Sequence, residues 1–446
     1  MAASPARLVA FDILLQVEQQ DAYASELLHS KRFENLSAAD HSLATELVMG
    51  TLRWRSFLDL EIEHHSSKSL PKLDIEVLIA LRMAAYQILF LTRVPSRAAV
   101  HESVELVKRA KKKSAVPFAN AVLRKVSARP KVDPLGLIAD SKTISELVAA
   151  SAHPQWLVER WVERYGESAA RKICLYDQGP PGLALRIPNP QVEAELQREG
   201  VVLSPGRLLR AARRVASGDV TSTGVFFAGR LSVQDEASQL VAMVVGKGEK
   251  ILDCCAAPGG KTRVLAEVNP ASKILAAELH PHRARLLRQL VAAQNVEVEN
   301  IDILQLPVQH SFDRVLTDVP CSGTGTLARN PEIKWRLKPE DLADLQSRQR
   351  AILQSSLQHV AMGGRLVYST CSLEREENEG VLEAVLEENP TFRLVPAITV
   401  LEDLQELGEL AWPTPKDLTS GPYLRTLPGV HPCDGFFAAI LEKVRA

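Results

Sequence analysis

The second half of the chain alternates short apolar runs with longer helical stretches, and this alternation constrains the fold more than any other feature. The runs lie near 250–254, 273–278, 312–318 and 364–370. Strands that alternate with helices indicate βαβ units, which build a mostly parallel sheet covered on both faces. A further run at 435–441 predicts a closing antiparallel strand. Ligands of such sheets bind beyond the carboxyl ends of the strands, so the residues that follow each run are candidates for a site.

A glycine-containing loop follows the first run. Its residues are Cys255, Ala256, Ala257, Pro258, Gly259, Gly260 and Lys261. Glycines where a strand meets a helix let the backbone turn sharply and approach a ligand closely. The spacing is neither the GxGxxG of dinucleotide-binding proteins nor the phosphate-binding GxxxxGK(S/T). We therefore expect a cofactor at this loop, and a dinucleotide is a poor fit.

Two acidic residues stand where the next strands should end. Glu278 closes the run 274–277, and Asp302 follows Asn300 and Ile301. A carboxylate after the second strand is placed to accept both hydroxyls of an adenosine ribose, and Asp302 would lie beside the adenine. A ribose-binding acid without a phosphate cradle indicates S-adenosylmethionine. The alternative is that each acid simply begins a surface loop, which is the better interpretation of either one alone.

Two cysteines follow the remaining runs. Cys321 ends the sequence Asp318-Val319-Pro320-Cys321, and Cys371 follows Thr370. Amino-methyltransferases carry an Asp/Asn-Pro-Pro-aromatic motif after the fourth strand, where it grips an exocyclic nitrogen. Here a thiol replaces the aromatic ring. Because the strands end at one edge of the sheet, we expect Asp318, both thiols and the glycine loop to meet there.

This pair of thiols predicts covalent chemistry on cytosine. Carbon 5 of cytosine is not nucleophilic enough to attack a methyl sulfonium unaided, but a thiolate that adds to C6 turns it into an enamine-like carbon. After methyl transfer, a base must remove the C5 proton before the enzyme can be released. A lone cysteine in apolar surroundings is normally inert core, and this is our interpretation of Cys174.

The chain divides into three predicted domains. Residues 1–134 show apolar positions at helical spacing and end in a proline-containing linker, which predicts an all-α domain. Residues 135–235 combine helical stretches with a strand-like run at 183–187, which predicts a small α+β domain. Residues 236–446 form the predicted α/β domain, a Rossmann-like unit with a mostly parallel sheet.

Charge and cysteine content narrow the function classes. The net charge of −1 argues against wholesale coating of nucleic acid, but nine Lys/Arg gather in 101–131, and a second cluster comprises Arg207, Arg210, Arg213 and Arg214. Either cluster alone is equally well a solvated face. If the protein acts on nucleic acid, both clusters are expected to bind backbone phosphates.

Six scattered cysteines indicate a reducing cytoplasm, and we expect no signal peptide, membrane helix or metal.

Six segments resemble the RNA 5-methylcytosine methyltransferases. They are 253–262, 318–322, 329–335, 368–372, 376–378 and 434–437. The N-terminal third resembles the RNA-binding NusB domain, through 40–53, 98–104 and 120–124. The fusion of a NusB-like domain to this catalytic domain is the arrangement of the RsmB (Sun, Fmu) enzymes, and the resemblance covers nearly the whole chain.

The resemblance implies an S-adenosylmethionine-dependent cytosine-C5 methyltransferase of 16S ribosomal RNA. We expect a cytoplasmic protein that acts on free or early-assembly RNA; the sequence does not give the oligomeric state, for which we favour a monomer. The resemblance also implies that Cys371 is the nucleophile, that Cys321 assists product release and that Asp318 lies with them in the catalytic site. The implied cofactor contacts are Cys255–Lys261, Glu278, Asp302 and Asp318. Glu278 stands where the family commonly has Asp, so a longer side chain must reach the ribose.

Two alternatives remain at this point. One is the same chemistry on another RNA such as tRNA, against which only the NusB-like domain argues. A non-catalytic ribosome-assembly factor built on an inactive methyltransferase is disfavoured, because both thiols, Asp318 and the glycine loop are present.

Overall fold

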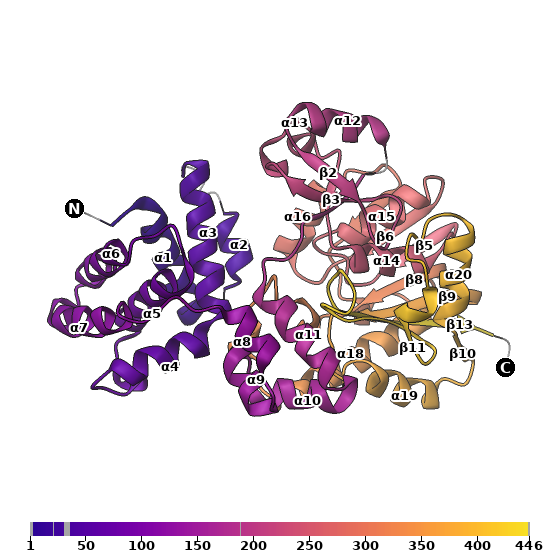
Figure 1. Ribbon diagram of the computed structural model, residues 1–446. Helices are drawn as coiled ribbons and strands as arrows, with labels where there is room; N and C mark the ends of the chain where they lie inside the picture. Colours follow the sequence, from indigo (N-terminus) through magenta and orange to yellow (C-terminus); the bar gives the residue numbers. More distant parts are fainter. Residues whose placement is uncertain (1–2, 21, 31–35, 188, 445–446) are drawn as a thin grey trace. The chain divides into compact units, whose positions relative to one another are not determined.

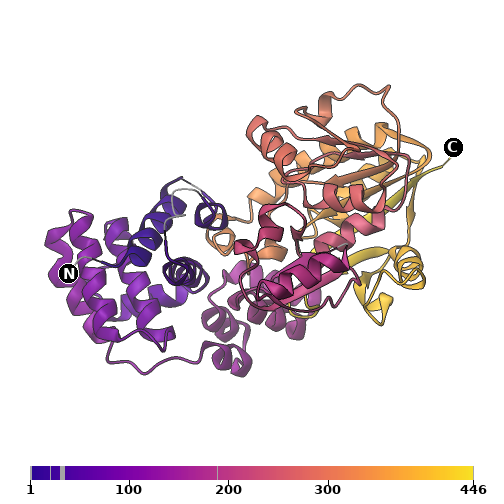
Figure 2. The same cartoon turned by 90° about the horizontal axis from the view of Figure 1, so that it is seen from above.

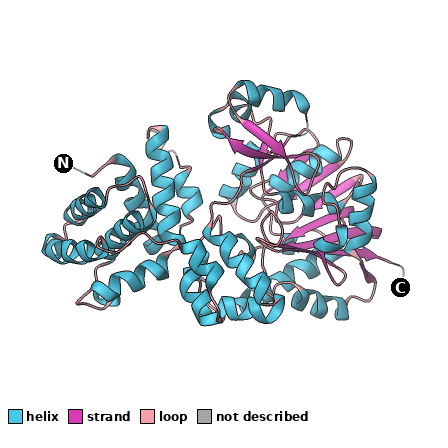
Figure 3. Cartoon of the chain, in the orientation of Figure 1, coloured by secondary structure: helices cyan, strands magenta, loops and turns pink. Residues whose placement is uncertain are grey.

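The protein forms two compact units in a computed structural model that describes residues 3–20, 22–30, 36–187 and 189–444 (Figure 1). The first unit comprises residues 1–181 and 327–336, and the second comprises 182–326 and 337–446. In the described part of the first unit all regular structure is helical, and the strands lie in the second (Figure 3).

The N-terminal unit is built around α5 (Ile75–Phe90), in which every residue from Val77 to Leu89 is buried. The helices packed on it are α1 (Pro5–Gln20), α3 (Ala38–Arg53), α4 (Arg55–His65), α6 (Ser96–Arg109) and α7 (Val116–Val126). A short helix, α2 (Ala24–Leu28), contacts α1 and α3. Ser37 caps α3 by accepting a hydrogen bond from the Asp40 amide. The predicted all-α N-terminal fold is confirmed.

Four further helices belong to the same unit. They are α8 (Pro134–Asp140), α9 (Ile144–Ser151), α10 (Gln155–Tyr165) and α11 (Glu167–Gln178), and Figure 2 shows them from a second direction. Helix α9 packs on α4, and Gln178 Nε2 at the end of α11 donates to the Arg53 carbonyl at 3.1 Å. These contacts place the unit boundary at 181/182, whereas the sequence placed a domain boundary at 134/135.

The N-terminal unit also contains a segment from the second half of the chain, residues 327–336, which ends in α17 (Ile333–Arg336). Lys334 Nζ donates to the carbonyls of Arg53 and Ala152, at 2.8 and 3.0 Å, and Trp335 Nε1 donates to the Leu52 carbonyl at 2.7 Å. Helix α3 ends at Arg53, where carbonyls lack partners within their own helix, so this segment satisfies them.

The second unit contains a small antiparallel sheet of order β2-β3-β1-β4. Its strands are β1 (Ala184–Arg186), β2 (Val202–Pro205), β3 (Ala212–Ser217) and β4 (Ser232–Val233), accompanied by α12 (Pro190–Arg198) and α13 (Gly224–Phe227). A separate core that includes Leu185, Leu196 and Val225 holds this subdomain together. The α+β character predicted for 135–235 thus belongs to its second part, because strands begin only at Ala184.

The large sheet has nine strands, with β10 paired on β13 and the others in the order β11-β12-β13-β9-β8-β5-β6-β7. The parallel strands are β5 (Lys250–Asp253), β6 (Lys273–Ala277), β7 (Val296–Glu299), β8 (Phe312–Asp318) and β9 (Val360–Thr370). The antiparallel strands are β10 (Phe392–Val395), β11 (Thr419–Ser420), β12 (Tyr423–Thr426) and β13 (Phe436–Lys443). The predicted strands and the antiparallel closing strand are confirmed.

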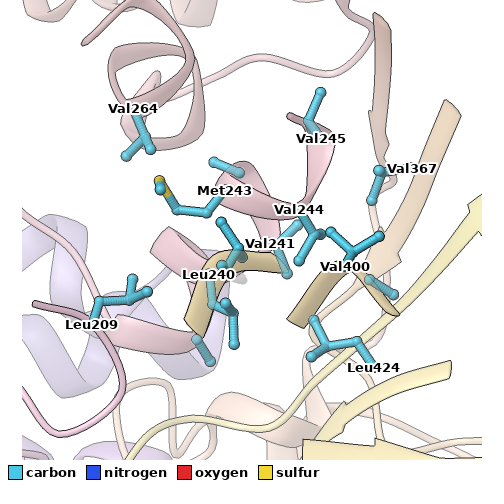
Figure 4. Close-up of a cluster of buried hydrophobic side chains, with 14 of the residues drawn as sticks. Leu209, Leu240, Val241, Met243, Val244, Val245, Val264, Val367, Val400 and Leu424 are labelled. Atoms are coloured by element: carbon cyan, nitrogen blue, oxygen red, sulfur yellow. The ribbon is translucent and has the colours of Figure 1, made fainter. Parts of the chain in front are cut away.

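Helices cover both faces of this sheet. Ile251, Leu316 and Val367 join the core formed with α14 (Glu236–Val245), α15 (Gly260–Val268) and α20 (Ala397–Glu406), part of which Figure 4 shows. The alternate residues Leu252, Val315 and Leu366 face α18 (Asp341–Gln358) and α19 (Glu379–Glu388). Burial on both faces explains why these strands read as continuous apolar runs. None of the described helices is long and apolar enough to cross a membrane.

The buried Lys334 generates a prediction about pH. Burial lowers the pKa of Lys334 to about 7, whereas an unfolded lysine titrates near ~10.4. Between these values the unfolded chain binds more protons than the folded chain, so this lysine makes stability rise with pH. Relative to a Lys334→Met variant, the wild-type protein should therefore gain stability from pH ~7 to ~9. Urea denaturation of both proteins across this range measures the difference, and parallel profiles would contradict the prediction.

Candidate active site

The two predicted thiols lie side by side. Strands β8 and β9 are parallel neighbours in which Asp318 is paired with Ser369, so the residues just beyond them are brought together. The Cys321 and Cys371 sulfurs are 3.3 Å apart, and both residues are partly exposed. The hydrogen bond between the thiols, together with burial, raises the pKa of Cys321 well above its ordinary value. Cys321 is therefore held as a protonated thiol next to a second sulfur.

A buried carboxylate, Glu377, joins the loops that carry the two cysteines. It accepts hydrogen bonds from the Ser322 amide at 2.8 Å, from the hydroxyls of Ser322 and Ser372, and from Gln349 Nε2 at 2.8 Å. Its side chain is inaccessible to solvent. The sequence analysis noted 376–378 only as part of a resemblance and gave Glu377 no role. The sequence signal for this role was the serine that follows each cysteine, Ser322 and Ser372, because a buried carboxylate needs hydroxyl or amide donors.

Asn378 fixes the Cys371 loop further. Its Oδ1 accepts from the Thr370 hydroxyl at 2.5 Å, and its Nδ2 donates to the Ser372 carbonyl at 2.9 Å. One side chain thus binds the residues on both sides of Cys371.

Lys261 reaches the site through Asp318. The Lys261 ammonium lies 2.6 Å from one carboxylate oxygen of Asp318, and the Ser369 hydroxyl donates to the other at 2.6 Å. Burial alone would lower the pKa of Lys261, but Asp318 outweighs it, and Cys371 also acts in the upward direction. The lysine therefore carries its positive charge close to Cys371. The sequence placed Lys261 in the cofactor loop but did not predict its ion pair with Asp318.

The glycine loop connects β5 to α15. Gly259 has φ +112°, and a Cβ atom there would lie 2.5 Å from Val291 Cγ2, so this position requires glycine. The Ala257–Pro258 peptide bond is cis. Asp253 at the end of β5 accepts a hydrogen bond from the Thr262 hydroxyl at 2.7 Å, and burial raises the pKa of Asp253 to about 7. This bond ties the strand to the first turn of the helix.

A cavity of about 250 Å³ opens at the carboxyl ends of these strands. The predicted residues that line it are Cys255, Ala257, Glu278, Asp302, Asp318, Cys321 and Cys371. Ala256, Pro258, Gly259, Gly260 and Lys261 are absent from its lining, so they shape the loop or act through Asp318. The sequence analysis missed His280 and Arg283, which also line it and which begin the helix after β6.

The chemistry of the lining fits S-adenosylmethionine. Glu278 is buried and its Oε1 accepts from the His280 amide at 2.9 Å, which fixes the carboxylate at the end of β6 (Lys273–Ala277). Asp302 and Asp318 supply two more carboxylates, and Arg283 is the one Lys or Arg among the described lining residues. A carboxylate-rich cavity suits a ribose and a sulfonium cation and disfavours a pyrophosphate. The described residues contain no cluster suited to a metal ion.

Comparisons with known proteins agree along the whole chain. Residues 241–442 match the family model described as 16S rRNA methyltransferase RsmB/F, and residues 4–128 match the NusB family. The chain is 34% identical to the probable ribosomal RNA small subunit methyltransferase B of Bacillus subtilis, with 99% of this chain and 100% of that protein covered. It is 31% identical to ribosomal RNA small subunit methyltransferase B of Vibrio cholerae, covering 98% and 97%. The crystal structure of PH0851 superposes with a TM-score of 0.80 at 25% identity, covering 99% and 100%.

The Glu377 contacts predict a large effect on stability. A Glu377→Ala variant leaves the Ser322 amide and Gln349 Nε2 without this acceptor, and it should lower the free energy of unfolding by about 2–4 kcal/mol. The matched control is Glu383→Ala, because Glu383 is exposed and paired only with the exposed Arg375, and its loss should cost less than ~1 kcal/mol. The stabilities of the two variants are compared through the midpoints of their urea denaturation curves. Equal midpoints would mean that Glu377 does not hold the loops together.

Proposed function

Because the chain belongs to the RsmB/F family of 16S rRNA methyltransferases, we propose that it methylates carbon 5 of a cytosine in 16S ribosomal RNA through a covalent adduct. Family membership establishes the broader activity: the protein is an S-adenosylmethionine-dependent rRNA methyltransferase. The choice of carbon 5, the covalent step and the 16S target are the proposal.

The observation that carries the proposal is the pair of sulfurs 3.3 Å apart beside the cofactor cavity. One thiolate adds to C6, and the electron pair of the C5–C6 double bond becomes available at C5. Carbon 5 then attacks the sulfonium methyl group, and S-adenosylhomocysteine leaves with the electrons of the broken S–C bond. A base removes the C5 proton, the double bond re-forms and the enzyme sulfur is expelled. These reaction steps need a nucleophile and a base that lie close to each other.

The charges around the thiols support the division of roles. The Lys261 ammonium interacts electrostatically with Cys371, and a cation beside this sulfur suits the assignment of Cys371 as the nucleophile. Glu377 contributes to the raised pKa of Cys321, after the hydrogen bond with Cys371 and burial. A neutral Cys321 thiol does not compete with Cys371 as the nucleophile, and it must lose its own proton before its sulfur can accept the C5 proton and assist release. Asp318 positions Lys261 and lines the cavity.

Cofactor binding is assigned to the edge of the sheet at β5 and β6. Glu278 would accept the ribose hydroxyls, Asp302 would lie beside the adenine, and Cys255 and Ala257 of the glycine loop would contact the rest of the cofactor. When bound, S-adenosylmethionine supplies an electrophilic methyl group. The protein residues orient it toward the thiols at Cys321 and Cys371.

The basic segment 101–131 is partly neutralised within its own unit. Lys112 pairs with Asp74 at 3.0 Å and lies 3.7 Å from Glu76, and Arg109 pairs with Asp12. The cations of this segment that make no ion pair with a described residue are Lys111, Lys113, Arg124, Lys125 and Lys131, and we assign these to RNA phosphates.

The two thiols should fail in different ways. A Cys371→Ser variant cannot form the adduct, so it should neither methylate 16S RNA nor crosslink to it. A Cys321→Ala variant should still attack and transfer the methyl group but release RNA poorly. Incubation with labelled S-adenosylmethionine and isolated 16S RNA, followed by denaturing gel electrophoresis, should show a covalent species only for Cys321→Ala. Mapping of 5-methylcytosine in the product tests the modified atom.

Controls make this experiment decisive. A Cys174→Ala variant removes a buried thiol of the N-terminal unit and should methylate normally without trapping RNA. If Cys371→Ser traps RNA and Cys321→Ala does not, the roles are reversed. If neither variant traps RNA and both methylate, the covalent mechanism is wrong.

Binding of S-adenosylmethionine should depend on Glu278. Loss of hydrogen bonds to a charged group costs ~1.5–3 kcal/mol, so Glu278→Ala should weaken binding by roughly 10- to 150-fold. The matched control is Glu297→Ala, an exposed acid on the neighbouring β7 outside the cavity. Calorimetry with S-adenosylmethionine compares them, and unchanged affinity in Glu278→Ala would refute the ribose assignment.

A further inference from the structure

A second hollow lies in the catalytic unit and shares no lining residue with the cofactor cavity. It has a volume of about 440 Å³, within the range of ~300–1,000 Å³ usual for ligand sites. Its walls come from Phe227–Arg230 after α13 of the small subdomain, from Arg263–Glu267 on α15, and from 289–293 at the end of α16 (Pro281–Leu290).

An exposed aromatic ring stands at this hollow. Phe227 is 78% exposed, the highest value for a large apolar side chain among the described residues. Its ring packs edge-on against the ring of Phe226, with the two ring centroids 6.2 Å apart. One neighbour thus supports the Phe227 ring while most of its surface remains exposed. Leu290, 47% exposed, lines the same hollow. Aromatic rings held open to solvent beside a hollow are the platforms on which single-stranded nucleic acids stack their bases.

The hollow also contains an arginine that forms no ion pair with a described residue, although Glu267 on the same helix acts on its charge. Arg186 pairs with Glu267 at 2.7 Å, and Arg230 pairs with Glu195 at 2.6 Å, so these two cations are compensated. Arg263 donates to the Gly229 carbonyl at 2.8 Å and forms no ion pair with any residue that the structure describes. A guanidinium has five N–H donors, so most of those on Arg263 remain for a ligand. The lining thus offers a positive group suited to a phosphate.

Helix α16 links this hollow to the cofactor cavity. Arg283 in its first turn lines the cavity, and Leu290 at its end lines the hollow. Seven residues at 1.5 Å each separate them by about 10 Å. Arg285 and Arg288 lie between, and neither forms an ion pair within the described part of the chain. A short stretch of single-stranded RNA can span this distance along a basic helix.

We propose that this hollow binds one nucleotide of the substrate RNA near the target cytosine, with the base stacked on Phe227 and the phosphate bound by Arg263. The identity of the ligand rests on the proposed function, because the strand that reaches the thiols is RNA. The site itself rests on the exposed ring, on the N–H donors of Arg263 that form no ion pair with a described residue, and on the hollow that both line.

The test measures RNA binding by the full-length protein. Fluorescence anisotropy with an oligocytidylate of about twelve nucleotides compares the wild type with Phe227→Ala, which should bind roughly 5- to 100-fold more weakly. A Phe227→Trp variant keeps a stacking face and should retain wild-type affinity. The matched control is Leu407→Ala, which truncates a side chain of similar exposure (74%) elsewhere in the unit and should change nothing. An Arg263→Gln variant should lower the salt dependence of binding by a slope of about 0.7.

The outcomes separate this inference from the proposed function. If Phe227→Ala binds oligocytidylate as tightly as Leu407→Ala, the stacking site is refuted. If Phe227→Trp binds as weakly as Phe227→Ala, stacking is refuted as the cause. Unchanged S-adenosylmethionine affinity in the variants excludes a folding defect. A wild-type protein that binds the oligonucleotide through Phe227 but does not methylate 16S RNA would refute the function and leave the site standing.

Discussion

The reactive geometry depends on the buried carboxylate of Glu377. A charge without access to solvent is unfavourable unless donors surround it, and the donors here come from the loop after β8, the loop after β9 and helix α18. Each loop in turn contains polar groups that would be unsatisfied without this acceptor. Glu377 needs the donors of both loops, and those donors need Glu377 as an acceptor. These hydrogen bonds therefore fix both loops in one arrangement. That arrangement, together with the hydrogen bond between the two thiols, holds the sulfurs 3.3 Å apart.

The same arrangement makes two identical side chains chemically different. Glu377 is among the causes that raise the pKa of Cys321, whereas the Lys261 ammonium, held by Asp318, interacts electrostatically with Cys371. The cofactor loop contributes to this asymmetry, because Lys261 is its last residue. Binding of the methyl donor and activation of the thiol therefore share one segment of chain.

The features that could be predicted from the sequence are those that depend on local patterns of apolar residues and on strand order. Strands β5, β6, β8 and β9 are buried on both faces and so appear as apolar runs, and residues at strand ends follow from the topology. The unit boundary did not follow, because α8–α11 join the N-terminal unit through contacts such as that of Gln178 with Arg53. Segment 327–336 escaped prediction for the same reason: Lys334 satisfies helix-end carbonyls far away in sequence. Glu377 and the Lys261–Asp318 pair likewise depend on tertiary contacts that have no local pattern.

Charge is distributed within the catalytic unit according to what each region would bind. The cofactor cavity collects Glu278, Asp302 and Asp318 with one arginine, whereas the second hollow collects Arg186, Arg230 and Arg263 with one carboxylate, Glu267. A sulfonium cation and RNA phosphates have opposite requirements, and the two linings differ in the sign of the charge that predominates. Helix α16 extends from the cavity, which Arg283 lines, to the hollow, which Leu290 lines. Under the proposed assignments, the methyl donor would occupy the carboxylate-rich cavity at the sheet edge while a nucleotide of the RNA occupies the hollow.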